Sequence, residues 1–276
     1  MAIITLLSAK GSPGVSTLAV GLALAWRSAL PGRSALVVDA DPAGGDFAAG
    51  VLGGALPAGS GMIPLATTRG ASPVDAVAGA AVHLAPDGSA QLLAGVPDST
   101  RAGALVLAWD ILTAAGADLG RQGTDLLVDA GRVDLARTPS PWLVATDLAL
   151  LVVRPTLPAV TAAHRLVARW SAPGAQTSAT PLGLVIVAAP SPYREREVAA
   201  AVGAPCRAVI PFETPHARVH SEGVTPMRGF GRSGYARALL GLAGELTAEF
   251  GLAADVGVEP GGPRPSAPAH QPGGAR

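Results

Sequence analysis

The sequence predicts an α/β fold in which a mostly parallel β-sheet is flanked by helices on both faces. Short apolar runs alternate with longer helical stretches along the chain, which is typical of strand–helix–strand crossover units. Two of the short runs, at residues 126–128 and 148–153, are apolar without interruption, as expected of strands buried on both faces of a sheet. Hydrophobic residues make up 49% of the 276-residue chain and aromatic residues only 4%. We therefore expect Ala, Val and Leu to build the core.

In the first half of the chain, the apolar runs predict strands at residues 3–8, 35–39 and 90–94. The helical stretch after the first strand covers residues 16–30 and would end at Pro31. The stretch at residues 44–70 is rich in Gly, Ala and Pro and predicts a loop that includes one helical turn. Ser72 and Pro73 are typical of a helix start, with Ser72 as the cap and Pro73 at the first helical position.

In the second half, further strands are predicted at residues 125–129, 148–153, 182–188 and 208–210. The helical stretches that alternate with the strands cover residues 102–119, 158–170, 194–202 and 234–250. A turn is expected at residues 217–223. The sequence has no internal repeat. We predict one domain over residues 1–252 and a disordered tail at residues 253–276, because the tail is rich in Pro, Gly and Ala and has little to bury.

Composition and charge argue against several functional classes. Lys and Arg number 20, as do Asp and Glu, so the chain has no net basic charge for binding nucleic acid. Cys206 is the single cysteine, which is typical of a protein in a reducing compartment. No apolar run approaches the roughly 18 residues that span a bilayer, and the last predicted helix carries Glu245 and Glu249, unlike a basic membrane-binding helix. We expect a cytoplasmic protein that binds neither nucleic acid nor a membrane directly.

A glycine-containing loop lies between the first predicted strand and the first predicted helix, and its sequence is AKGSPGVST (residues 9–17). In such a loop, backbone N–H groups and the positive end of the helix dipole form an anion site. The usual P-loop also carries a lysine that reaches the β- and γ-phosphates, followed by a hydroxyl that binds Mg²⁺. Here Ser16 supplies the hydroxyl, Val15 stands at the lysine position, and Lys10 stands near the start of the loop.

Acidic residues follow two of the predicted strands. Asp39 and Asp41 end the strand at 35–39, and Asp129 ends the strand at 125–129. These features also have simpler interpretations. The glycines could serve a tight turn alone, Lys10 could be a solvated side chain, and the aspartates could cap loops.

The loop and the acidic segments, in this order and at the ends of predicted strands, resemble the MinD/ParA family of deviant P-loop ATPases, whose loop pattern is K-G-G-x-G-K-[ST]-T. In that family the lysine that matches Lys10 crosses a nucleotide-sandwich dimer to the partner's phosphates, whereas the second lysine is replaced here by Val15. The resemblance implies that Asp41 positions the attacking water or the Mg²⁺ shell. It also implies that Asp129 holds Mg²⁺ through water and that Pro211 lies near the adenine.

The resemblance implies a defined set of ligand contacts. The residues for ATP are Lys10, Gly11, Ser12, Gly14, Val15, Ser16, Thr17 and Pro211. The residues for Mg²⁺ are Ser16, Asp41 and Asp129, and in an active enzyme Asp41 and Lys10 would be catalytic. Family members often carry an adenine-contacting amide at residues 189–192, where this chain has APSP. His216 and His220 have the spacing of a helical metal pair, but with no third ligand nearby they are interpreted as a surface pair.

Val15 is the departure from the family pattern with the largest expected consequence. A lysine–phosphate contact contributes roughly 1.5–3 kcal/mol, or about 10- to 150-fold in affinity. Losing one comparable donor typically slows a reaction by ~10²–10³. Val15 keeps its N–H, so part of the anion cradle remains, although Pro13 contributes no N–H. We predict weak or absent binding of ATP and Mg²⁺ and weak or absent hydrolysis.

Three functional hypotheses follow. In the first, a degenerate MinD/ParA-like protein acts as a positioning or scaffold factor. Its loop and its segment DADPAGGD (39–46) most resemble actinobacterial members of the TadZ/CpaE branch, which implies Tad-type pilus or secretion machinery and a CpaF-like ATPase as partner. A homodimer and recruitment to the membrane or pole through partners are also implied.

In the alternative, the chain is an active ParA/MinD-type ATPase that acts in chromosome or plasmid partitioning or in division-site placement. Lys10 would then substitute for the missing lysine. A metabolic enzyme such as a dethiobiotin-synthetase-like ligase is the least favoured class, because its chemistry needs the lysine that Val15 replaces.

Overall fold

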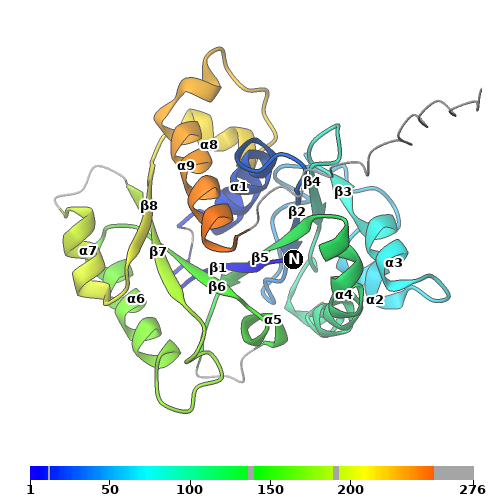
Figure 1. The fold of residues 1–276 in the computed structure, drawn as a ribbon, viewed down its shortest axis with the longest axis horizontal. Coiled ribbons are helices and arrows are strands. Elements are labelled where there is room, and N and C mark those ends of the chain that lie inside the picture. The colour runs from blue at the N-terminus through cyan, green and yellow to red at the C-terminus, as the bar shows by residue number, and fades with distance from the viewer. Residues whose placement is uncertain (12, 136–139, 189–192, 252–276) are drawn as a thin grey trace, which may run out of the picture.

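The computed structural model describes residues 1–11, 13–135, 140–188 and 193–251 of the 276-residue chain. The eight strands of this part form one sheet in the order β3-β4-β2-β5-β1-β6-β7-β8 (Figure 1). Every neighbouring pair is parallel except β3 and β4. The predicted α/β fold with a mostly parallel sheet is confirmed. The predictions for Ser12, for residues 189–192 and for the tail at 253–276 lie outside the described residues.

The strands follow the predicted apolar runs. Their bounds are β1 (Ile3–Ser8), β2 (Ser34–Asp39), β3 (Val82–His83), β4 (Ala90–Leu93), β5 (Thr124–Arg132), β6 (Leu148–Val153), β7 (Leu182–Ala188) and β8 (Cys206–Pro211). The helices are α1 (Val15–Ala29), α2 (Met62–Thr67), α3 (Pro73–Ala80), α4 (Gly103–Arg121), α5 (Pro141–Val144), α6 (Leu157–Trp170), α7 (Glu195–Val202), α8 (Thr214–Ser221) and α9 (Gly234–Glu249).

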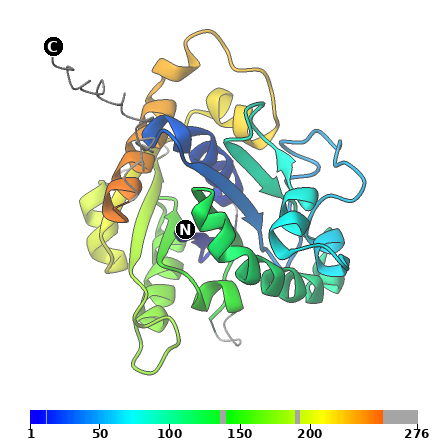
Figure 2. The ribbon, with the colours of Figure 1, turned by 45° about the vertical axis from the view of Figure 1, so that its right-hand side comes forward.

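Helices cover both faces of the sheet. Side chains of β1 alternate between the two faces: Ile4 and Leu6 pack with α1 and α9, whereas Leu7 packs with the helices on the other side. Helices α1 and α9 form one layer, with α8 against α1, and α2 to α7 form the other. Helices α2 and α3 lie beside α4 (Figure 2). The apolar composition of the central strands therefore follows from burial on both faces.

Helix α4 is long and apolar enough to cross a membrane when it is judged by length and composition alone. Its residues Leu105, Ala108, Trp109 and Leu112 are at most 2% exposed and belong to the core on one face of the sheet. Asp110 interrupts the apolar run on the exposed side. In this fold α4 packs as a core helix.

Some local elements differ from the sequence prediction. Strand β3 and helix α5 are absent from the sequence prediction, because two and four residues are too short to show a periodic pattern. The turn expected at 217–223 is wrong, since α8 occupies most of it; Pro215 stands in the first turn, where its fixed φ favours a helix start. Strand β5 continues to Arg132, because Ser8 of β1 still pairs with it there.

The predicted helix start at residues 72–73 is confirmed, with Ser72 Oγ accepting a 3.3 Å hydrogen bond from the N–H of Asp75.

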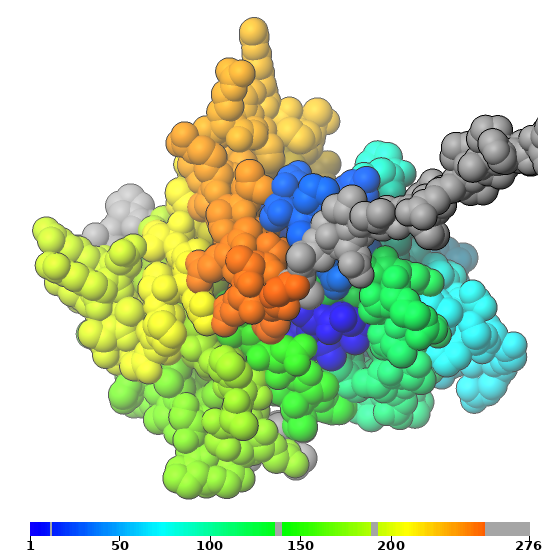
Figure 3. Space-filling view, in the orientation of Figure 1, coloured from blue at the N-terminus to red at the C-terminus, as the bar shows by residue number. Residues whose placement is uncertain are grey.

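At the opposite side of the sheet, the segment that joins α8 to α9 projects from the surface (Figure 3). Glu222, at the start of this segment, borders the cleft described next.

Candidate functional site

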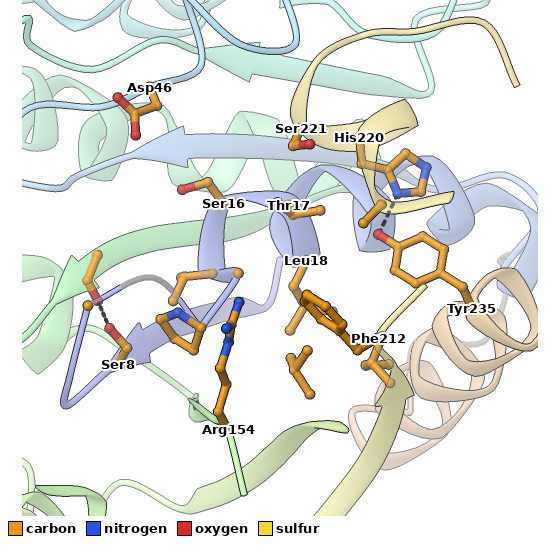
Figure 4. A pocket seen from close by; sticks show the side chains of 18 of the residues that line it. Ser8, Ser16, Thr17, Leu18, Asp46, Arg154, Phe212, His220, Ser221 and Tyr235 are labelled. Carbon is orange, nitrogen blue, oxygen red and sulfur yellow. Dashed lines mark hydrogen bonds between the residues drawn. The ribbon is translucent and has the colours of Figure 1, made fainter. Parts of the chain in front are cut away.

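A cleft of about 600 Å³ opens at the carboxyl ends of the central strands. Its walls come from the carboxyl ends of β1, β5, β7 and β8 and from the segments that follow β1, β2, β6 and β8, together with parts of α1, α8 and α9 (Figure 4). In the sheet, β2 and β5 lie on one side of β1, whereas β6 lies on the other side. The order in which strands are added to the sheet therefore reverses at β1. Ligands of open α/β sheets bind at such points, and the volume lies within the range of small-molecule sites.

The glycine loop after β1 forms the wall of the cleft at the start of α1. Gly14 is the N-cap of α1 with a φ of 101°, which glycine adopts readily, and no side chain of the described residues caps this helix end. A Cβ added to Gly11 or Gly14 would meet no other part of the described chain within 4 Å. The glycines thus leave open space beside the helix N-terminus, where free N–H groups and the helix dipole favour an anion.

Val15 occupies the lysine position of the loop and carries no charge into the cleft. It is 5% exposed and packs in the apolar cluster between the sheet, α1 and α9, while it also borders the cleft. Ser16 and Thr17 are partly exposed and border the cleft as well. The loop therefore presents hydroxyl and N–H groups to a ligand, but no side-chain cation at position 15.

Two carboxylates are buried close to the loop. Asp39 and Asp129 are register partners of β2 and β5, and each residue is 1% exposed. Burial raises the pKa of Asp129 to about 6, although hydrogen bonds from the Ser16 hydroxyl and the Gly131 N–H (2.8 Å) act in the opposite direction. Burial also raises the pKa of Asp39 well above its ordinary range, and the nearby charge of Asp129 raises it further.

Asp41 and Asp46 line the cleft from the segment after β2. Burial raises the pKa of the half-buried Asp41, a 2.8 Å hydrogen bond from the Ala43 N–H lowers it, and the charge of Asp46 raises it. Gly131 has a φ of 59° and leaves room for the Asp41 carboxylate, which a Cβ at this position would overlap. Asp46 is not among the residues that the sequence analysis singles out, although it ends the DADPAGGD segment.

Ser16 and Asp41 line one end of the cleft, and the buried Asp129 accepts a hydrogen bond from the Ser16 hydroxyl and lies close enough to Asp41 to feel its charge. The described residues contain no group of three or more His, Cys, Asp or Glu side chains arranged to hold a metal ion by themselves. Mg²⁺ bound with a nucleotide keeps several waters and takes few protein oxygens, so a hydroxyl with nearby aspartates fits this kind of site. A divalent cation would also favour the charged forms of these carboxylates, whose pKa values burial raises.

Arg154 is a cleft residue that the sequence analysis misses. It directly follows β6 and extends from the end of that strand toward the start of α1 (Figure 4). Its guanidinium carbon lies 5.0 Å from the centroid of the Phe212 ring. Its Nε is buried and has no hydrogen-bond partner among the described residues. Its position at the carboxyl end of a central strand is the sequence feature that could have indicated it.

The other end of the cleft is apolar and aromatic. Pro211, one of the predicted contacts, lines it together with Tyr235. The Tyr235 hydroxyl lies 3.0 Å from Nδ1 of the buried His220, and burial lowers the pKa of His220 to about 4. The predicted surface pair with His216 is therefore wrong. Helix α8 turns His220 inward against Gly21 of α1, where a Cβ would clash with the imidazole.

Lys10 is exposed and lies outside the main cleft. It lines an adjoining cavity of about 230 Å³ together with Gly11, Pro13 and Arg154. Lys10 thus stands apart from Ser16 and the aspartates. This placement is compatible with a residue that reaches toward a second molecule.

Comparison with known proteins finds a likeness in fold. No family model matches the sequence, and no curated protein does. The chain is similar to the septum site-determining protein MinD complexed with Mg-ADP from Pyrococcus horikoshii OT3, with 19% identity, 92% of this chain and 99% of that chain covered, and a TM-score of 0.68. It is also similar to a ParA family ATPase from Chlorobium tepidum TLS (18% identity, 88% and 97% covered, TM-score 0.65).

A chain of the MinC:MinD cell division protein complex from Aquifex aeolicus is a further structural neighbour (18% identity, 90% of this chain and 96% of that chain covered, TM-score 0.63). In all three cases nearly the whole neighbour is matched. The chain therefore has the α/β fold of MinD- and ParA-type P-loop proteins.

Proposed function

We propose that this chain is a MinD/ParA-like protein that binds a nucleoside triphosphate and Mg²⁺ weakly, hydrolyses it slowly or not at all, and acts as a positioning or scaffold factor. The observation that carries the proposal is Val15, which packs into the core at the lysine position of a cleft that keeps Ser16, Asp41 and Asp129. The cleft thus retains groups for an anion and a cation but lacks the loop lysine.

The two ends of the cleft suit the two ends of a nucleotide. The uncapped N-terminus of α1 favours phosphates, and the end around Pro211 and Tyr235 offers an apolar wall for a base. The MinD neighbour from P. horikoshii was solved with Mg-ADP, which supports a nucleotide as the ligand here. Because Val15 supplies no charge, we expect affinity to be lower by about 10- to 150-fold than with a lysine.

Slow hydrolysis follows from the same residue. Phosphoryl transfer is catalysed mainly by positioning and by cations that stabilise the transition-state charge. Asp41 lines the cleft and in this proposal orients a water molecule, but Val15 offers no charge to the phosphoryl group being transferred. This combination favours a role in which the nucleotide, if bound, controls shape or assembly rather than being turned over.

A scaffold or positioning role requires protein partners. The MinC:MinD neighbour is a protein of this fold in complex with a partner. The resemblance of the loop and of residues 39–46 to the TadZ/CpaE branch favours Tad-type pilus or secretion machinery, with a CpaF-like ATPase as the partner. In this proposal the chain forms a homodimer, stays in the cytoplasm, and reaches the membrane or pole through its partners.

The alternative function is an active ParA/MinD-type ATPase in partitioning or division-site placement. The specific observation in its favour is that Ser16 and Asp41 line the cleft and that Lys10 borders the neighbouring cavity. With these groups in place, a cation other than the loop lysine, such as Lys10, would be sufficient to support some ATP hydrolysis. The two functions predict different rates of ATP hydrolysis, and this rate can be measured.

The test is a titration of the purified full chain with a fluorescent ATP analogue, with and without Mg²⁺, together with a phosphate-release assay. We expect Mg²⁺-dependent binding and turnover below ~1 per minute, where typical enzymes reach about 10 s⁻¹. Val15→Lys should tighten binding, and Val106→Lys, which adds the same charge on the exposed side of α4, is the matched control. Turnover well above ~1 per minute would favour the active ATPase, and no nucleotide binding at all would exclude both.

A further inference from the structure

We propose that Arg154 binds the phosphates of the nucleotide and supplies the positive charge that Val15 lacks. The inference rests on the nucleotide site proposed above and assigns the cation of that site. In this arrangement the phosphate-binding charge comes from the end of β6 instead of from the loop that opens α1. The affinity would then be higher than the loop alone allows.

The first observation is that Arg154 is partly buried and has no acidic partner among the described residues. Two other partly buried arginines pair with carboxylates: Arg33 with Asp125, and Arg207 with two glutamates of α9. In the part of the chain that the structure describes, no carboxylate lies within ion-pair distance of Arg154, and its Nε is buried without an acceptor. A buried, unpaired donor costs stability, so this arrangement calls for an anionic ligand that is bound in use.

The second observation is the register of the sheet. Strands β1 and β6 are direct neighbours, with Leu7 opposite Leu151. Arg154 lies three residues beyond Leu151, and Lys10, the second residue of the glycine loop, lies three residues beyond Leu7. The two segments therefore leave the sheet side by side. Both cavities at this edge include Arg154 together with Gly11 and Pro13 of the loop.

The third observation concerns the direction of the side chain. Figure 4 shows Arg154 rising from the end of β6 toward the start of α1, where Ser16 lies. Phe212 lies against one face of the guanidinium, 5.0 Å from ring centroid to guanidinium carbon, so the N–H groups around its edge stay available. A planar guanidinium offers paired donors that match two oxygens of a phosphate.

The other cations near the cleft are less suited to this role. Lys10 lies outside the main cleft, as described above. Arg132 lines the cleft but is exposed, and water screens the charge of an exposed group. Among the described residues, Arg154 is the cation near the cleft that is both partly desolvated and directed at the helix N-terminus, and an electrostatic contact is stronger where water is excluded.

The experiment compares the affinities of the full chain for Mg-ATP, Mg-ADP and AMP by calorimetric titration. In Arg154→Gln we expect about 10- to 100-fold weaker binding of Mg-ATP and Mg-ADP, and a change of less than about threefold for AMP. Arg196→Gln, an exposed arginine of α7 that lines none of the cavities described, is the matched control and should bind like the parent. Arg154→Lys keeps the charge but loses the paired donors of the guanidinium. Its affinity for Mg-ATP should therefore lie between that of the parent and that of Arg154→Gln.

A double-mutant cycle separates a phosphate contact from a structural effect. If both cations serve the same phosphates, Val15→Lys should tighten Mg-ATP binding more in the Arg154→Gln background than in the parent. Equal affinities of the parent and Arg154→Gln would overturn the inference while leaving the nucleotide site intact. Equal losses for AMP and ATP would overturn it as well, because they place Arg154 at the nucleoside. If the parent binds none of the three nucleotides, the proposed function fails and this inference fails with it.

Discussion

Asp39 and Asp129 stand opposite each other as register partners at the carboxyl ends of β2 and β5, and each is 1% exposed. Neither forms an ion pair within the described residues. Two buried acids at one strand edge are costly when both are ionised, because each is desolvated and each repels the other. The pair therefore opposes stability at neutral pH, and a bound divalent cation would reduce this cost.

The first prediction is that Asp129→Asn stabilises the folded chain more at pH 7 than at pH 4. The folded-state pKa of Asp129 is raised from 3.8 to about 6. The contribution of this side chain to folding stability is therefore fully present below about pH 4, where the carboxyl is protonated, and is lost as the pH rises through 6. The variant should gain up to about 3 kcal/mol over the parent across this range. Urea unfolding at pH 4, 5, 6 and 7 measures the difference. A gain that does not change with pH, or one that also appears in the exposed Asp110→Asn, would contradict the assignment.

The second prediction is a pH effect of opposite sign at His220. Burial lowers the folded-state pKa of His220 from 6.5 to about 4, whereas the unfolded chain takes up the proton near its ordinary value. Stability is therefore lost as the pH falls from about 6.5 to about 4. His220→Gln should lose this part of the acid sensitivity, measured by urea unfolding over the same pH range. His83→Gln, an exposed histidine, should keep it, and an unchanged pH profile in His220→Gln would refute the prediction.

The third prediction concerns Asp125, which is fully buried and ties β5 to three other segments. It accepts hydrogen bonds from the N–H of Ala2 (2.8 Å), from Trp26 Nε1 (3.0 Å) and from Arg33 Nε (2.8 Å). Asp125→Ala leaves a partly buried guanidinium without its partner, which should cost about 3–5 kcal/mol of unfolding free energy. Chemical denaturation measures the loss. Asp118→Ala breaks an exposed ion pair and should cost less than ~1 kcal/mol; similar losses in the two variants would argue against this role for Asp125.

The fourth prediction separates backbone strain from damage to the cleft. Gly131→Ala places a Cβ on the Asp41 carboxylate, so Asp41 must move and Mg²⁺-dependent nucleotide binding should weaken at least about tenfold. Gly203→Ala is the matched control, since its φ of 84° is also left-handed but a Cβ there meets no other part of the described chain within 4 Å. Both variants should lose about 1–2 kcal/mol of stability from strain. Equal nucleotide affinities in the two would show that the position of Asp41 is unimportant for binding.

The main elements could be predicted from the sequence because they are marked by local patterns. The short apolar runs place β6 and β7 at the bounds that the structure has. The glycine loop and Asp129 also stand out, since each belongs to a short contiguous motif next to a strand. Short elements such as α5 escape this kind of analysis, because a single turn has no period.

The residues that the sequence analysis misses share a different physical origin. Arg154 and Asp46 reach the cleft from separate segments, and only the strand order brings those segments to one edge of the sheet. His220 is buried because the small Gly21 on α1 admits its ring, a contact between residues far apart in the chain. Pairings of this kind are tertiary and leave no pattern at short range.

The last prediction concerns Lys10, which is exposed at the edge of the site and outside the main cleft. If it contacts the phosphates of a second copy, Lys10→Gln should weaken nucleotide-dependent dimerisation by about tenfold or more, the value of a charge-assisted bond. Nucleotide binding by the monomer should change little, because the groups that line its own cleft are unaltered. Light scattering with and without a non-hydrolysable ATP analogue measures assembly, with the exposed Arg69→Gln as the control. Loss of monomer binding as large as the loss of dimer would instead place Lys10 on the nucleotide of its own chain.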